Sequence, residues 1–137
     1  MNNPSKLNEA IFIVEDDGFY ALLIQNLLVS HGYHNCHVFD SGKACLEHLD
    51  MKPKLIFLDY FLGLENGHSV LGQIKDLSPE TYVVMLSGQE YVHISIKSFR
   101  LGAFDYIEKN KDASEHILAV AARIFSNAEE DFSQLRH

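Results

Sequence analysis

The sequence predicts an α/β fold, a doubly wound five-stranded parallel sheet with helices on both of its faces. Short apolar runs alternate along the chain with segments whose apolar residues recur at helical spacing. The runs 10–14, 55–58 and 82–86 are almost entirely apolar, which is typical of central strands covered on both faces. Each crossover between parallel strands is right-handed and must pack back on the sheet, so helices are expected on both sides.

The order of the elements follows from these runs and from the residues that separate them. The expected strands are 10–14, 34–39, 55–58, 82–86 and 104–107. The second of these is the most polar, so it is expected at an edge of the sheet. The expected helices are 19–31, 42–49, 67–77, 90–101 and about 113–125. Gly32 suits the end of the first helix and Ser41 the start of the second.

The fourth expected helix has apolar residues on more than one side. They are Tyr91, Val92, Ile94, Ile96, Phe99 and Leu101. One side is expected to face the core, and the other is expected to face either a partner protein or a more deeply buried part of the fold.

Length and composition restrict the classes of function. The 137 residues form one domain of ordinary apolar content, 47%. The net charge of -8 disfavours direct binding to nucleic acid or to an anionic membrane, since both require surplus cations. No apolar run approaches the roughly 20 residues of a membrane span. With no signal peptide and with two cysteines lacking metal-type spacing, a cytoplasmic protein with reduced thiols is expected.

The expected domain spans residues 9–126. Residues 1–8 are interpreted as a disordered N-terminal arm, and residues 127–137 as a polar C-terminal tail or the start of a linker. That tail is too short for an output domain, so the chain is either a domain that acts alone or part of a longer protein.

Polar side chains follow the expected strands where those strands end. Glu15, Asp16 and Asp17 follow the first strand, and Asp59 ends the third. Ser87 follows the fourth and Lys109 the fifth. Ligands of such sheets bind outside the carboxyl ends of the strands. Carboxylates, a hydroxyl and an ammonium at one edge predict a site for phosphate and a divalent metal.

Simpler interpretations exist for several of these residues. Asp17 is interpreted as part of a solvated turn or as the N-terminal cap of a helix, and Ser87 is also placed to cap the fourth helix. Tyr106 fits a packed core position as well as a functional one. The histidines have no ligand spacing, so solvated or packed roles are expected for them.

The chain resembles the receiver domain of two-component response regulators over about residues 9–126. The residues that match the motifs of that family are Glu15, Asp16, Asp59, Gly67, Ser87, Gly102, Ala103, Tyr106 and Lys109. Each match is weak alone, but their order and separations together are specific. The resemblance implies a flavodoxin-like (βα)5 fold with strand order 2-1-3-4-5.

The resemblance also implies a chemistry. Asp59 would be the nucleophile that takes a phosphoryl group from a histidine of a kinase or histidine phosphotransfer protein. Crowded carboxylates with hard oxygen ligands favour Mg²⁺. Asp16 and Asp59 would bind it directly, Glu15 through water, and Phe61 through its backbone carbonyl. Lys109 would neutralise charge on the phosphoryl oxygens, and Ser87 would hydrogen-bond one of them.

Phosphorylation is expected to act as a switch rather than as part of an enzyme's turnover. Ser87 would move toward the phosphoryl group and Tyr106 would turn inward, which changes the surface of the fourth helix, fifth strand and fifth helix. That surface is expected to bind a downstream protein, an output domain outside this sequence, or a second copy of the chain as a homodimer.

Three positions depart from the family pattern or tune it. Asn110 and Gly63 stand where the family usually has proline, so the loop after Lys109 is expected to have a trans peptide and the loop after Asp59 to be looser. Phe61 is apolar and does not orient water, which predicts slow self-dephosphorylation.

Other functions on a similar fold remain open. A phosphatase of the haloacid dehalogenase type needs a second acid two residues after the nucleophile, where this chain has Phe61. A phosphate-independent binding module is a second alternative, supported by Asn110 and Gly63. A flavin-binding domain is disfavoured because the acidic cluster would repel a flavin phosphate, and no GKS or GKT loop indicates a nucleotide hydrolase.

Overall fold

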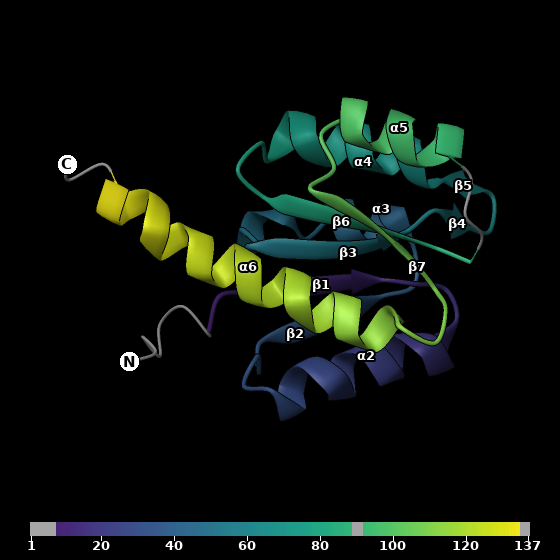
Figure 1. Ribbon diagram of the computed structural model, residues 1–137. Coiled ribbons are helices and arrows are strands. Elements are labelled where there is room, and N and C mark those ends of the chain that lie inside the picture. The colour runs from purple at the N-terminus through teal and green to yellow at the C-terminus, as the bar shows by residue number, and fades with distance from the viewer. Residues whose placement is uncertain (1–7, 89–91, 135–137) are drawn as a thin grey trace.

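The computed structural model describes residues 8–88 and 92–134, with side chains described as far as residue 126 (Figure 1). Most of the predicted N-terminal arm therefore lies outside the described residues, as do Gln89, Glu90 and Tyr91 at the expected start of the fourth helix. Among the described helices, none combines the length and the apolar character that crossing a membrane requires.

The predicted five-stranded parallel sheet is confirmed, with the order β2-β1-β3-β6-β7. Its strands are β1 (Ile11–Val14), β2 (Cys36–Phe39), β3 (Leu55–Asp59), β6 (Tyr82–Ser87) and β7 (Asp105–Glu108). This is the expected order 2-1-3-4-5, because the labels β4 (Phe61–Leu62) and β5 (Glu65–Asn66) belong to a small antiparallel hairpin. That hairpin was not predicted, since two-residue strands carry no detectable periodicity.

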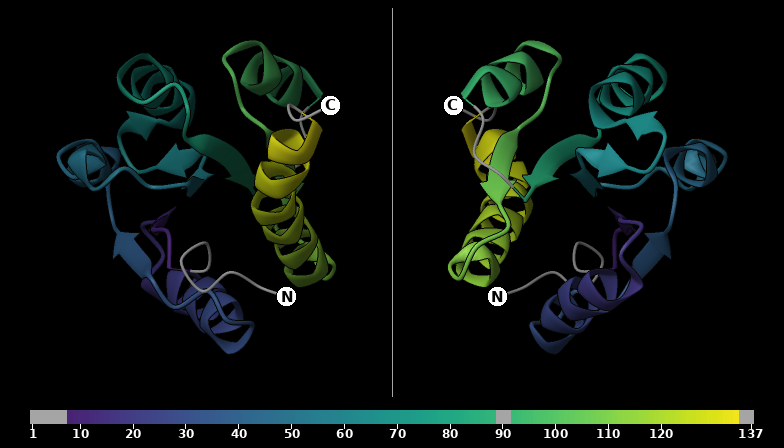
Figure 2. Two further views of the ribbon diagram at one scale, coloured as in Figure 1. Left: turned by 90° about the vertical axis from the view of Figure 1, so that its left-hand side faces the viewer. Right: turned by 90° about the vertical axis from the view of Figure 1, so that its right-hand side faces the viewer.

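Helices cover both faces of the sheet (Figure 2). One face carries α2 (Gly18–Ser30) and α6 (Ala113–Gln134), and the other carries α3 (Gly42–Leu46), α4 (Gly67–Leu77) and α5 (Val92–Arg100). Each face of the sheet has its own hydrophobic core, and alternate residues of a central strand pack into one core or the other. In β1, Ile11 and Ile13 pack toward α2 and α6, whereas Phe12 and Val14 pack toward α3 and α4. All four side chains are buried, as expected for β1 between two other strands.

The end of the last helix was predicted wrongly. The expected end near Phe125 is passed, and α6 continues to Gln134, beyond the end of the sheet (Figure 1). The segment that was interpreted as the start of a tail contains no proline or glycine before the chain ends. Without such a residue nothing in the sequence stops the helix, and its polar composition fits a solvated helix as well as a tail. The second expected helix is shorter than predicted and is followed by a 3₁₀ turn at Leu49–Met51.

Of the two interpretations of Asp17, the structure shows the helix cap, and the predicted end of the first helix at Gly32 is confirmed. The Asp17 carboxylate accepts hydrogen bonds from the backbone N–H groups of Phe19 (3.0 Å) and Tyr20 (3.2 Å) at the start of α2. Gly32, with a φ of 97°, follows His31, the C-terminal cap of that helix. Asp17 is thereby occupied in a structural role, which separates it from the two acidic residues before it.

Candidate functional site

The acidic residues predicted to form a site come together at the carboxyl edge of the sheet. Parallel pairing sets Val14 beside Leu58, so the residues that follow these two strands are neighbours. Carboxylate oxygens of Glu15, Asp16 and Asp59 lie within 4.8 Å of one another. Glu15 and Asp59 are buried and Asp16 is exposed, so the cluster opens to solvent on one side.

Lys109 completes this cluster from the end of β7. Its ammonium forms ion pairs with Glu15 and, at 3.3 Å, with the Asp59 carboxylate. The backbone N–H of Lys109 donates to the Ser87 carbonyl (2.7 Å), which continues the pairing of β6 with β7. Strand pairing therefore fixes the position of the Lys109 backbone, and the ion pairs with Glu15 and Asp59 fix the position of its ammonium.

Burial and neighbouring charges shift the pKa values of the ionisable groups in the pocket. Burial, together with the neighbouring Asp59 carboxyl, raises the pKa of Glu15 to about 8. Burial alone would lower the pKa of Lys109, but its hydrogen bond to Glu15 and the charge of Asp59 outweigh burial and raise it. Without a further cation the pocket therefore favours a proton on Glu15 over a full set of ionised carboxylates.

A divalent cation fits this donor set. Among the described residues, the Oε2 atom of Glu15 is a buried side-chain oxygen that has no hydrogen-bond partner. A buried carboxylate oxygen without a partner is costly unless a cation or an ordered water satisfies it. Hard oxygen ligands suit Mg²⁺, which keeps several waters and needs few protein ligands. Glu15, Asp16 and Asp59 are the residues that could hold it.

The hydroxyl and aromatic residues predicted for the switch lie on β6, which pairs with β3, and on β7, which pairs with β6. Ser87 ends β6 and is fully buried, and it pairs in register with Glu108. Tyr106, two residues earlier on β7, is partly buried and packs against the core on the α3, α4 and α5 face. This position of Tyr106 therefore fits both a role in the switch and a role in core packing.

The loop after Asp59 is ordered by the hairpin of β4 and β5. The Phe61 backbone N–H donates to the Asp59 Oδ1 atom at 3.4 Å, and the Phe61 side chain is 55% exposed. Gly63 has a φ of 66°, a left-handed conformation that proline cannot adopt. This glycine thus serves a tight hairpin rather than a looser loop.

Gly67 fixes the same loop to the start of α4. A Cβ atom at this glycine would lie 2.7 Å from the Tyr60 Cα atom and 3.0 Å from the Asp59 carbonyl oxygen. The Gly67 N–H donates to the Tyr60 carbonyl at 2.9 Å. The absence of a side chain therefore lets α4 begin directly against the backbone that carries Asp59.

The loop after Lys109 has the expected trans geometry, since the described residues contain no cis peptide. The Asn110 N–H donates to the Glu108 carbonyl (2.9 Å), which a proline could not do. The Asn110 side-chain oxygen accepts from the Asp112 N–H (2.9 Å) just before α6. Asparagine therefore shapes this turn by two hydrogen bonds of its own.

Sequence reasoning missed two contributors to the site. In the sequence Tyr20 recurs at the helical spacing of the apolar residues Leu23, Ile24 and Leu27, but its ring lies against the Lys109 ammonium, 4.7 Å from the ring centroid to Nζ. Glu65 accepts hydrogen bonds from the N–H groups of Gly42 (2.8 Å) and Lys43 (3.0 Å), so the hairpin caps α3. Neither long-range contact leaves a signal in the local sequence pattern.

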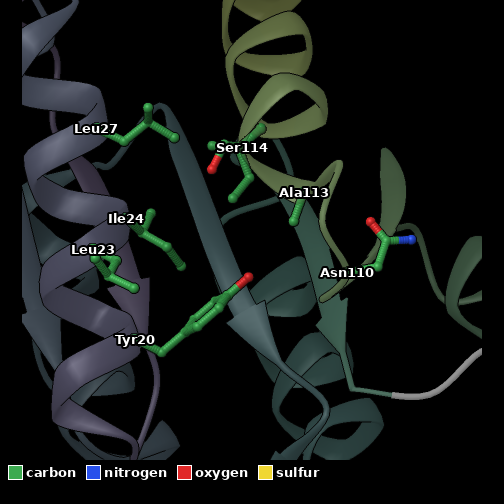
Figure 3. Close-up of a pocket in the computed structure, with 8 residues that line it drawn as sticks. Tyr20, Leu23, Ile24, Leu27, Asn110, Ala113 and Ser114 are labelled. Atoms are coloured by element: carbon green, nitrogen blue, oxygen red, sulfur yellow. The ribbon is translucent and has the colours of Figure 1, made fainter.

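A groove between α2 and α6 adjoins the pocket (Figure 3). It has a volume of about 220 Å³ and is lined mainly by apolar side chains, namely Tyr20, Leu23, Ile24, Leu27, Asn110, Ala113, Ser114 and Ile117. In Figure 3 the ring of Tyr20 projects from α2 toward the ends of the strands. Tyr20 thus borders both the groove and the charged pocket.

Comparison with known proteins agrees with this geometry. The profile of the response regulator receiver domain family matches residues 11–121. The chain belongs to the response regulator receiver domain family. This confirms the resemblance inferred from the order of the motif residues.

Individual relatives support the same assignment. The nitrogen assimilation regulatory protein NtrX of Azorhizobium caulinodans is 33% identical over 110 residues, which are 79% of this chain and 24% of that protein. The receiver domain of NtrX from Brucella abortus has a TM-score of 0.78 at 30% identity, covering 85% of this chain and 98% of that one. The Mn²⁺-bound form of response regulator Rcp1 has a TM-score of 0.73 at 25% identity, covering 82% and 91%. The chain spans about a quarter of the length of the curated NtrX, so that whole protein's activity does not transfer to it.

Proposed function

We propose that this receiver domain takes a phosphoryl group onto Asp59 from a phosphohistidine of a histidine kinase or histidine phosphotransfer protein. The observation that carries the proposal is the buried Asp59 carboxylate, which lies 3.3 Å from the Lys109 ammonium and within 4.8 Å of two further acidic side chains. A nucleophile, a cation and a set of metal ligands thus share one pocket at the edge of the sheet.

Asp59, Lys109 and Ser87 each have a separate role in the proposed phosphoryl transfer. An Asp59 oxygen attacks phosphorus, the P–N bond to the partner's histidine breaks, and the imidazole leaves with that electron pair and takes up a proton. Lys109 stabilises the charge on the phosphoryl oxygens, and Ser87 donates a hydrogen bond to one of them after transfer.

The divalent cation proposed for the pocket is Mg²⁺. Asp16 and Asp59 would bind it directly, Glu15 through water and Phe61 through its backbone carbonyl. When bound, the ion would supply positive charge to the transferring phosphoryl oxygens. The unpartnered Oε2 atom of Glu15 and the Mn²⁺ bound to the related regulator Rcp1 support a divalent ion here.

The output is proposed to be a change of surface and not a released product. Ser87 and Tyr106 would couple the phosphoryl group to the face made by α5, β7 and α6. On α5 the side chains of Val92, Ile96 and Phe99 are 46–66% exposed, whereas Ile94 and Ser98 are buried. This exposed apolar stripe supports binding of a downstream protein, an output domain or a second copy of the chain.

The proposal is tested by incubating the purified chain with a small acyl phosphate, with and without Mg²⁺, and measuring intact mass. We expect a Mg²⁺-dependent adduct of one phosphoryl group that is absent from Asp59→Asn. No adduct on folded protein with the metal present would overturn the proposal in favour of a phosphate-independent binding module. Sustained release of phosphate from a generic phosphoester would indicate a phosphatase instead.

A further inference from the structure

We propose that Tyr20 is a positioning residue whose ring holds the Lys109 ammonium against the Asp59 and Glu15 carboxylates. The contact itself belongs to the described structure, and its consequence for phosphoryl transfer rests on the proposed function. The family motifs contain the acidic residues, the hydroxyl and the lysine, but the aromatic ring that contacts that lysine comes from α2.

The Lys109 ammonium contacts both the carboxylates and the ring. Lys109 Nζ lies 4.7 Å from the centroid of the Tyr20 ring, and it also forms ion pairs with Glu15 and Asp59. The face of an aromatic ring attracts an ammonium through its quadrupole, more strongly where water is largely excluded. The Lys109 side chain is 18% exposed, so this contact is partly shielded from solvent.

The position of Tyr20 is itself well determined. Its backbone N–H is one of the two donors capped by the Asp17 carboxylate, so Tyr20 lies in the first turn of α2. Its ring packs against the core between α2 and α6. The acidic run after β1 therefore has two tasks: Glu15 and Asp16 belong to the pocket, and Asp17 fixes the helix that presents the ring.

A ring has an advantage over another carboxylate at this position. An ammonium has three N–H donors, and a lysine stem has many rotamers that must be restricted before transfer. Glu15 and Asp59 accept from two of these donors at most in the ion pairs described above. A ring attracts the cation without competing strongly for the third donor, which is left for a phosphoryl oxygen.

The test separates the ring from the hydroxyl and from general packing. Tyr20→Phe retains the ring, Tyr20→Leu retains only apolar bulk, and Leu22→Ala removes an exposed side chain of the same helix, 55% exposed in the structure. Two quantities are measured for each folded variant. One is the NMR shift of the Lys109 side-chain ε protons in lysine-labelled protein, identified by its absence from Lys109→Met. The other is the initial rate of adduct formation with a small acyl phosphate and Mg²⁺.

We expect the Lys109 ε protons to be shifted upfield by the ring in wild type, Tyr20→Phe and Leu22→Ala, and to lose that shift in Tyr20→Leu. The rate should fall about fivefold in Tyr20→Leu and stay near wild type in the other two. A lost shift with an unchanged rate, or an equal fall in rate for Phe and Leu, would overturn the positioning role.

The two proposals fail in distinguishable ways. If the wild type takes up no phosphoryl group, the phosphoacceptor function fails, whereas the NMR shift still reports whether the ring holds the ammonium. If the wild type is phosphorylated but its Lys109 ε protons resonate as in an exposed lysine, the phosphoacceptor function stands and the role of Tyr20 is refuted.

Discussion

The two loops that flank Asp59 are held in place by different forces. The lysine side, residues 109–112, is held by ion pairs to Glu15 and Asp59, by the ring of Tyr20 and by the hydrogen bonds of Asn110. The hairpin side, residues 60–67, is held by the close approach of the Gly67 backbone to that of Tyr60. It is also held by hydrogen bonds that the Glu65 carboxylate accepts from the first N–H groups of α3.

Because the two loops are held differently, substitutions in them are expected to affect different properties of the protein. Charged groups on the lysine side face the reactive carboxylate, so changes there should alter phosphorylation more than stability. Contacts on the hairpin side join the loop to α3 and α4, so changes there should alter stability more than phosphorylation. Phe61 is the exception on the hairpin side, because its backbone N–H contacts Asp59 and its side chain is exposed.

The largest expected effect is the loss of stability in Gly67→Ala. The new Cβ atom would lie 2.7 Å from the Tyr60 Cα atom and 2.8 Å from its carbonyl oxygen, and backbone at such distances cannot rotate away. We expect the free energy of unfolding to fall by about 2–3 kcal/mol, measured by urea denaturation. The matched control is Gly72→Ala in the same helix, which has open space and should raise it by about 0.5–1 kcal/mol. Equal effects of the two substitutions would refute a close approach at Gly67.

Phe61→Asn should have the next largest effect, and on chemistry instead of stability. An amide side chain at this exposed position can hydrogen-bond a water molecule beside the phosphoryl group, which phenylalanine cannot. We expect the phosphorylated Asp59 to lose its phosphoryl group about tenfold faster, followed by intact mass after removal of the donor. Phe61→Leu is the apolar control and should decay like the wild type. A Phe61→Asn variant that loses phosphate no faster contradicts the assignment of slow decay to this side chain.

Loss of the Glu65 cap should cost less than the Gly67 substitution. Glu65→Gln replaces one of the two acceptor oxygens by a donor that faces a backbone N–H, so one of the bonds to Gly42 and Lys43 is lost. We expect the free energy of unfolding to fall by about 1 kcal/mol, while the rate of adduct formation stays near that of wild type. The exposed Glu47 at the end of α3 gives the control Glu47→Gln, with little change expected. A fall in phosphorylation without a fall in stability would mean that Glu65 belongs to the chemistry.

Much of the fold was predictable because its signals are local. The apolar runs of β1, β3 and β6 and the breaks at Gly32 and Gly102 lie in continuous stretches of sequence. Strand ends then placed Glu15, Asp59 and Lys109 at one edge, because parallel strands present their carboxyl ends together.

What could not be predicted depends on contacts between distant residues. Tyr20 recurs at the spacing of a core residue, so only the fold reveals its contact with Lys109. Glu65 caps a helix more than twenty residues earlier in the chain. The end of α6 was missed for another reason: the polar residues after Phe125 fit both a tail and a solvated helix.

The smallest expected effect concerns His68, which joins the hairpin side to α5. Its ring packs edge-on against Tyr60, and its Nε2 atom lies 2.8 Å from the Ser98 hydroxyl and 3.2 Å from the Ile94 carbonyl. Burial, with a smaller contribution from the charge of Lys97, lowers the pKa of His68 from its ordinary value of 6.5, although the Ile94 carbonyl acts in the opposite direction.

The sign of the pH dependence follows from this shift. The unfolded chain binds a proton at His68 more readily than the folded chain, so this stabilisation is present above pH 6.5 and is lost as the pH falls below it. We expect the free energy of unfolding to fall more steeply in wild type than in His68→Leu as the pH is lowered from about 7.5 to about 5.5. Contributions of the other histidines are common to both proteins and cancel in the comparison. Parallel pH profiles would mean that His68 is protonated as easily in the folded chain as in the unfolded one, and that its bridge to α5 survives a positive charge.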